Sequence, residues 1–244
     1  MKYLFPVIIA ATLLLSVSMP AQAGLFDDLT SVLDRVGGSP GSSLDDPTIA
    51  KGLKEALATG TTRAVKSVSQ RDGYFSNDMI KILLPEKIRS TAELLGKFGF
   101  QQEVDDFVLS MNRAAEKAAP KATEHFTTAL KAMSFDDARA ILNGDATSAT
   151  RYFREKTGDM IYSDFRPVVI ANMKDVGVSR SYSQMKAKVE TIPFAGTVGS
   201  FDLDHYVTSK AVDDLFSMLG EEEKKIRSDP AARGTELLKK VFGK

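Results

Sequence analysis

The sequence predicts an all-α fold: a multi-helix bundle of about eight to ten helices, kinked at Pro120 and preceded by a signal peptide and a short amphipathic helix. Apolar residues recur at three- and four-residue intervals, which is the spacing of one face of a helix. No region alternates apolar and polar residues with the two-residue period of a strand. Proline, glycine, asparagine and aspartate divide this pattern into segments and indicate where helices begin and end.

The first 23 residues are predicted to be an export signal. Lys2 supplies a positive charge, residues 3–17 are almost wholly apolar, and Ala21-Gln22-Ala23 has the small-x-small pattern of a cleavage site. The apolar run is shorter than the roughly 20 residues that cross a bilayer, and no later stretch is apolar enough. We therefore expect cleavage after Ala23, a periplasmic location and no transmembrane span.

Residues 24–44 are predicted to form a short amphipathic helix, Gly24–Val36, and a linker rich in glycine and serine. The helix has three aspartates and one arginine, so anionic lipid would repel it. Docking on the protein's own core or on a partner protein is therefore favoured over peripheral contact with the envelope membrane. The remaining residues, 45–244, are predicted to be a helical domain.

The first helix of that domain is predicted to begin at Asp46-Pro47, because a capping residue followed by proline is typical of a helix start. Small residues then recur every four positions, at Gly52, Ala56, Gly60 and Ala64. Such a row leaves a smooth groove, against which a second helix can pack closely. We expect this row to be a helix-packing surface.

The same signals place the other boundaries. Residues 70–78 are expected to be a loop, and residues 191–202 an irregular connection. Glycines 158 and 177 are expected to separate helices, and Asp202 is expected to cap the helix that follows it. Further helices are predicted at residues 85–96, 101–119, 121–133, 134–143, 146–157, 159–175, 179–190, 202–227 and 230–242.

The composition excludes several kinds of function. The 32 basic residues match the 32 acidic ones, so the charge implies no nucleic-acid partner. Cysteine is absent, which removes disulfides, thiol catalysis and thiolate metal sites. The two histidines, His125 and His205, are interpreted as surface or capping residues, and neither a Gly-x-Ser-x-Gly nor a Walker motif is present. No cofactor, metal or catalytic residue is predicted.

The segment SMNRAAEKAAPKATEHF, residues 110–126, contains the candidate site. Its alanines would let another helix approach closely and would bring the roots of Asn112, Arg113 and Glu116 partly out of water. A charge held there must be paired, because an unpaired buried ion is costly. Glu116 lies three residues from Arg113 and is an available partner.

Two interpretations of this segment compete. In the first, the polar residues form a buried network that fixes helix register, and Arg166 or Arg151 approaches from another helix. In the second, Asn112, Arg113, Glu116, Lys117 and Arg166 form the polar end of a cleft for a small anionic or amphipathic ligand. We favour the structural interpretation and keep the ligand site as its alternative.

Six long motifs resemble an uncharacterised bacterial family, the domain of unknown function 4197. They are LPEKI (84–88), SMNRAAEKAAP (110–120), ILNGD (141–145), FRPVV (165–169), DLDHYVTSKAVDDLF (202–216) and EEEKKIRSDPAARGTELLKKVFG (221–243). The resemblance spans most of residues 48–243. It implies an exported helical domain, with no catalytic residues to transfer.

These observations together predict an exported, non-catalytic binding or interaction protein of the bacterial envelope. One alternative is a periplasmic carrier that holds a lipid or a small amphipathic or anionic ligand in a cleft between helices. A metal-dependent hydrolase is the less favoured alternative, since it would need a histidine to converge with two carboxylates.

Overall fold

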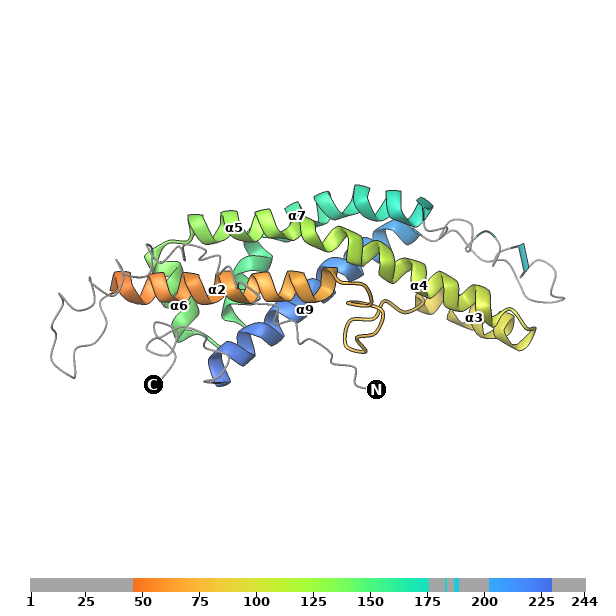
Figure 1. Ribbon diagram of the computed structural model, residues 1–244, viewed down its shortest axis with the longest axis horizontal. Coiled ribbons are helices and arrows are strands. Elements are labelled where there is room, and N and C mark those ends of the chain that lie inside the picture. Colours follow the sequence, from red (N-terminus) through yellow and green to blue (C-terminus); the bar gives the residue numbers. More distant parts are fainter. Residues whose placement is uncertain (1–45, 176–182, 184–186, 189–201, 230–244) are drawn as a thin grey trace, which may run out of the picture. The chain divides into compact units, whose positions relative to one another are not determined.

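A computed structural model describes residues 46–175, 183, 187–188 and 202–229 of the chain (Figure 1). All regular elements in these ranges are helices and none is a strand, so the predicted all-α class is confirmed. No helix among them has the length and apolar character that a membrane span requires. The signal peptide, the segment Gly24–Val36, most of the helix predicted at 179–190 and the last helix lie outside the described residues.

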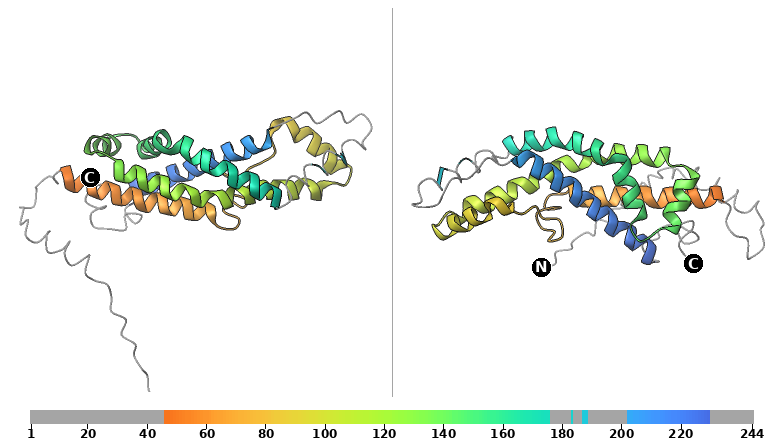
Figure 2. Two further views of the ribbon diagram at one scale, coloured as in Figure 1. Left: turned by 90° about the horizontal axis from the view of Figure 1, so that it is seen from above. Right: turned by 180° about the vertical axis from the view of Figure 1, so that it is seen from behind.

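Helix α2 (Asp46–Ser69) packs against α9 (Leu203–Ser228) along the predicted row of small residues. The side chain of Ile226 lies against Gly60, where an added Cβ would be only 3.3 Å from it, and Ile226 also packs on Ala56. Figure 2 shows α9 running obliquely across α2. The predicted helix-packing surface is therefore confirmed, and the partner that it receives is α9.

Pro120 interrupts the helical path as predicted. Helix α4 (Gln101–Ala118) ends in a single 3₁₀ turn, η1 (Ala119–Lys121), and α5 (Ala122–Ala132) follows directly. Proline lacks the N–H that would continue the α-helical hydrogen bonds, which explains the change of helix type at this point. The alanines of the segment are fully buried, as expected for a close helix contact, and they are Ala114, Ala115, Ala118, Ala119 and Ala122.

Helix α6 (Phe135–Asn143) begins at the predicted capping box. The hydroxyl of Ser134 accepts a hydrogen bond from the backbone N–H of Asp137, and the carboxylate of Asp137 accepts one from the N–H of Ser134. Two of the N–H groups that a helix start leaves unpaired are satisfied in this way.

Helix α7 (Ser148–Asp175) corrects the sequence prediction, which separated two helices at Gly158. The helix continues through Gly158 and also through Pro167. Glycine in a helix costs only about 1 kcal/mol relative to alanine, and the fully buried side chains of Phe153 and Phe165 on either side hold this helix in the core. Tertiary packing therefore outweighs the local preference of the glycine.

Aromatic rings fill the centre of the core. The ring of Phe126 on α5 packs edge-on against Phe153 of α7, with centroids 5.3 Å apart, and against Phe216 of α9 at 5.8 Å. Helix α3 (Glu86–Lys97) packs on α4, and the turn between these two helices passes through Gly99 at a φ of 87°. Residues 70–85 connect α2 to α3, and we call this segment the α2–α3 loop.

Candidate functional site

The α2–α3 loop leaves α2 through a tight turn. Asp72 takes a φ of 67°, in the left-handed region, and the N–H of Gly73 donates to the carbonyl of Gln70. A side chain at Gly73 would collide with the backbone carbonyls of Ser67 and Val68 at the end of α2. Glycine is therefore required where the chain turns back on the helix.

Asn112 of α4 fixes the far half of this loop. Its side-chain oxygen accepts a hydrogen bond of 2.9 Å from the N–H of Ile82, and its side-chain nitrogen donates to the carbonyl of Ile82 at 2.9 Å. The same nitrogen donates to the carbonyl of Val108 on its own helix. Asn112 is fully buried, so it pairs backbone groups that water does not reach.

Glu116 and Arg113 fix the near half. The buried carboxylate of Glu116 accepts hydrogen bonds from the N–H groups of Tyr74 and Phe75, and its second oxygen lies 2.7 Å from the guanidinium of Arg113. Arg113 also contacts the carboxylate of Asp72 at 2.6 Å. Burial opposes the charge of Arg113, but the hydrogen bonds to Glu116 and Asp72 outweigh it and raise its pKa above the ordinary value.

Two tyrosines tie the loop to α9. The hydroxyl of Tyr74 donates to the carbonyl of Ala211 at 2.7 Å, and the hydroxyl of Tyr206 donates to the carbonyl of Leu83 at 2.9 Å. Tyr74 is fully buried, and burial together with the nearby carboxylates of Asp214 and Glu116 raises its pKa well above the usual value. The loop is therefore held to both α4 and α9 by hydrogen bonds.

Asp214 is a buried carboxylate of α9 close to these tyrosines. One of its oxygens lies 3.2 Å from the ammonium of Lys210, one turn earlier on the helix. The other is buried and has no hydrogen-bond partner within the described part of the chain. Burial raises the pKa of Asp214 to about 6, against the opposing effect of Lys210. The charged form of Asp214 is thus only partly compensated.

Beside the loop lies an open groove of about 450 Å³, which we call the basic groove. It combines the last residues of the loop, the first turn of α3 and one face of α9. Four of its side chains are cations and one is an acid. The lining residues are Lys81, Leu83, Leu84, Pro85, Glu86, Lys87, Arg89, Tyr206 and Lys210.

A second groove, of about 390 Å³, lies between α2 and α5. Its walls combine apolar side chains, four threonines and the charged side chains of Lys54, Glu55 and Lys131. Several of the threonine hydroxyls donate to carbonyls of their own helix. Thr61 and Thr62 both donate to Ala58, and Thr127 donates to Thr123. These hydroxyls are therefore already bonded within their own helices.

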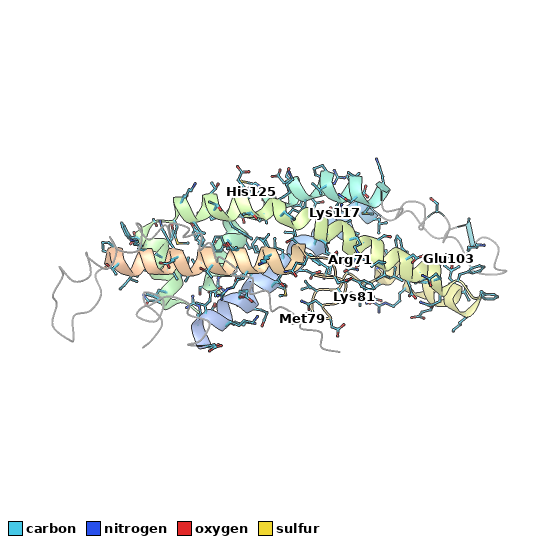
Figure 3. The ribbon with its side chains drawn as sticks, viewed as in Figure 1. Arg71, Met79, Lys81, Glu103, Lys117 and His125 are labelled. Atoms are coloured by element: carbon cyan, nitrogen blue, oxygen red, sulfur yellow. The ribbon has the colours of Figure 1, made fainter. Side chains whose placement is uncertain are left out.

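The predicted site residues separate into two groups. The structure brings Asn112, Arg113 and Glu116 together, but their partner is the α2–α3 loop and not the second helix that the sequence suggested. Lys117 is exposed and projects from α4 away from Met79 and Lys81 of the loop (Figure 3). Arg166 is exposed on α7 and is absent from this network.

Arg151 was the other cation expected to approach the network. It pairs instead with Asp145, at 2.9 Å, just before the start of α7. The additional charged partner of Arg113 is Asp72 of the α2–α3 loop. The tight turn at Gly73 brings the carboxylate of Asp72 to Arg113. The hydrogen bonds agree with the structural interpretation of Arg113 and Glu116, while the ligand-binding role of the five residues stays a prediction.

The histidines lie apart from these residues. His125 of α5 is 2.8 Å from the carboxylate of Asp164 on α7, and Nδ1 of His205 is 2.8 Å from the hydroxyl of Tyr162. The backbone N–H of His205 donates to Asp202, which caps α9 as predicted. Among the described residues, no three histidine or acidic side chains are grouped as a metal site would need.

A family model described as "Protein of unknown function (DUF4197)" matches residues 43–243. The chain belongs to this family. The resemblance noted in the sequence is thereby confirmed. Comparison with the curated proteins and with the solved structures gave no match.

Sequence reasoning about this DUF4197 protein missed the basic groove. The signal available was KILLPEKIR, residues 81–89, in which three cations flank apolar residues on both sides of Pro85. That stretch indicates a mixed surface, but Tyr206 and Lys210 come from a helix more than a hundred residues later. Only the folded chain brings the two halves together.

Replacing Arg113 with methionine is expected to destabilise this DUF4197 protein by about 2 kcal/mol, because the buried carboxylate of Glu116 loses its cation. The matched variant Arg166→Met, at an exposed position, is expected to change stability by less than about 0.5 kcal/mol. Thermal unfolding followed by circular dichroism compares the two. Unfolding of Arg113→Met that equals that of the wild-type chain would support the ligand-site interpretation instead.

Proposed function

We propose that the protein is an exported, non-catalytic binding protein of the bacterial envelope, and that its basic groove receives an anionic amphiphile. The observation that supports this proposal is the rigid anchoring of a segment that keeps cations and apolar side chains at the surface. An anionic amphiphile is a molecule with a negatively charged head and a hydrocarbon chain, which are the two chemical features that this groove complements.

The charges of the groove favour an anion. Lys81, Lys87, Arg89 and Lys210 face a single acidic side chain in the lining, that of Glu86. Glu86 pairs with Arg89 at 2.7 Å, and the buried Asp214 lies 3.2 Å from Lys210. Lys81 and Lys87 have no carboxylate partner among the described ion pairs, so the lining keeps a positive excess. Lysine is a suitable ligand for a sulfonate, phosphate or carboxylate head because its ammonium donates three hydrogen bonds.

Apolar residues near these cations provide contacts for a hydrocarbon chain. Leu83 in the groove is 55% exposed, and Met79 on the same loop is 65% exposed. Leu84 and the ring of Tyr206 also line the groove. Exposed leucine and methionine are common singly, but here they lie on one loop beside a cluster of cations.

The loop is held in position before any ligand arrives. Asn112 and Glu116 of α4 bind its backbone at Ile82 and at Tyr74, and Tyr206 binds the carbonyl of Leu83. A preorganised surface loses less conformational entropy on binding than a mobile one. The buried polar network thus supports the proposed site without itself contacting the ligand.

Decanesulfonate below its micelle concentration is a suitable probe, because its head keeps one negative charge at all relevant pH values. Isothermal titration calorimetry on the signal-free chain is expected to show binding of decanesulfonate and none of decyltrimethylammonium. Lys81→Gln and Lys87→Gln are expected to weaken the affinity by about three- to tenfold each, in proportion to the lost Coulomb attraction. Lys117→Gln is the matched control, because Lys117 lies on α4 and does not line the groove. This variant should bind decanesulfonate as the wild-type chain does.

Two results would contradict the proposal. One is that the sulfonate and the ammonium bind equally, since the charges of the groove would then have no role. The other is that phosphatidylglycerol vesicles bind the chain while decanesulfonate does not, which would make the loop a membrane-docking surface.

A further inference from the structure

One stripe of α9 connects the basic groove to the interior. Tyr206, Lys210 and Asp214 are spaced four residues apart, so they lie one above the other along the helix. Tyr206 and Lys210 line the groove, whereas Asp214 is buried. Lys210 therefore has two possible anionic partners, namely the carboxylate of Asp214 beneath it and the head of a ligand in the groove.

Among the described residues, Lys210 is the cation that acts on the carboxylate of Asp214. Asp213 precedes it on α9 but already pairs with Arg154 of α7, at 2.8 Å. Two tyrosines lie near Asp214, namely Tyr74 of the α2–α3 loop and Tyr206 of α9. The carboxylate of Asp214 contributes to raising the pKa of each of them. From α4, the carboxylate of Glu116 also acts on Tyr74, but it is neutralised by Arg113.

Lys210 contacts Asp214 but remains accessible from the groove. Its side chain is 40% exposed and its ammonium is 3.2 Å from one oxygen of Asp214. The other oxygen of Asp214 is buried and accepts no hydrogen bond from any residue that the structure describes, so this carboxylate is incompletely solvated. A carboxylate in that state gains more from losing its charge than an exposed one does.

We propose that Asp214 regulates the basic groove by competing with the ligand for Lys210, so that protonation of Asp214 frees this lysine and strengthens anion binding. The inference rests on the proposed function of the groove. Asp214 acts through Lys210 and is a positioning residue, since it does not reach the groove itself.

The direction of the pH effect follows from burial. The pKa of Asp214 is raised to about 6, so the carboxyl is largely neutral near pH 5 and charged near pH 7.5. Below its pKa the charge of Lys210 is uncompensated and adds to the positive groove. Above its pKa the charged carboxylate retains Lys210. Binding of an anion is therefore expected to weaken as the pH rises through about 6.

The test measures decanesulfonate affinity at about pH 5 and about pH 7.5 by calorimetry, since the charge of a sulfonate does not change in this range. The wild-type chain is expected to bind about three- to tenfold more tightly at the lower pH. Asp214→Asn, a neutral isostere, should bind tightly at both pH values. Lys210→Gln should bind weakly at both, while Lys87→Gln should weaken binding but keep the pH dependence.

The outcomes separate this inference from the proposed function. Equal wild-type affinity at both pH values, unchanged in Asp214→Asn, would overturn the inference and leave the groove as a binding site. If decanesulfonate binds neither at about pH 5 nor at about pH 7.5, both the inference and the proposed function are overturned. A second measurement is the NMR titration of the Asp214 carboxyl carbon, whose pKa should rise when decanesulfonate is bound, because linkage is reciprocal. A pKa that is unaffected by the probe would also overturn the inference.

Discussion

Replacing Glu223 with alanine is expected to lower the free energy of unfolding by about 3–5 kcal/mol, because it breaks a buried ion pair on one side only. Glu223 of α9 accepts hydrogen bonds from the N–H groups of Ala149 and Thr150, in the first turn of α7, and from the hydroxyl of Thr150. It is also 2.9 Å from the guanidinium of Arg227, whose side chain is mostly buried. The carboxylate thus caps the start of a helix that begins more than seventy residues earlier in the chain.

Arg227 extends this network to a third helix. Its guanidinium donates to the carbonyls of Ile141 and Leu142 at the end of α6. The pair of Glu223 and Arg227 therefore satisfies the end of one helix and the beginning of the next, where unpaired carbonyls and N–H groups would otherwise be left. Loss of Glu223 should therefore destabilise both the end of α6 and the start of α7.

Chemical denaturation in urea measures the effect of the Glu223→Ala change. Glu221→Ala is the matched control. Glu221 lies two residues earlier and makes an ion pair near the surface with Lys224, which is expected to be worth less than about 0.5 kcal/mol. Equal loss of stability in the two variants would contradict the capping role of Glu223.

Replacing Asn112 with alanine is expected to cost about 2–4 kcal/mol, because both backbone groups of Ile82 lose their partner in the interior. Ile82 is fully buried, so water does not replace the missing hydrogen bonds. The α2–α3 loop should then detach locally from α4. Hydrogen exchange at the N–H of Ile82 is expected to accelerate together with the loss of stability.

Asn172→Ala provides the control for that change. Asn172 on α7 donates to the carbonyl of Val168 four residues earlier, which reproduces the contact of Asn112 with Val108. Among the described contacts, Asn172 makes no hydrogen bond to a distant loop like those of Asn112 with Ile82. The expected result is a small change in stability for Asn172→Ala; a similar loss for both variants would show that the loop contact contributes little.

Local chemistry made much of the fold predictable. Pro120 interrupts a helix because it lacks an N–H, and Ser134 with Asp137 starts a helix because their side chains satisfy neighbouring backbone groups. The row of small residues from Gly52 to Ala64 indicated a close helix contact, and Ile226 of α9 occupies it. Each of these signals acts within one or two turns, so the order of residues is sufficient to reveal it.

The candidate site was predictable only in part. That Asn112, Arg113 and Glu116 lie at least partly out of water followed from the alanines around them, but their partner did not. Sequence spacing identifies residues on one face of a helix and does not identify what packs on that face. The left-handed turn at Asp72 was needed to bring the loop to Arg113.

The sequence by itself determined the helical class, most of the helix boundaries and the membership of the DUF4197 family, since all three depend on local patterns of side chains. Tertiary structure alone decided that α7 continues through Gly158, that Glu223 caps α7, and that residues 81–89 meet Tyr206 and Lys210 in one groove. These features depend on contacts between residues far apart in the chain. Their energies come from burial and from pairing of polar groups, which exist only once the helices have packed.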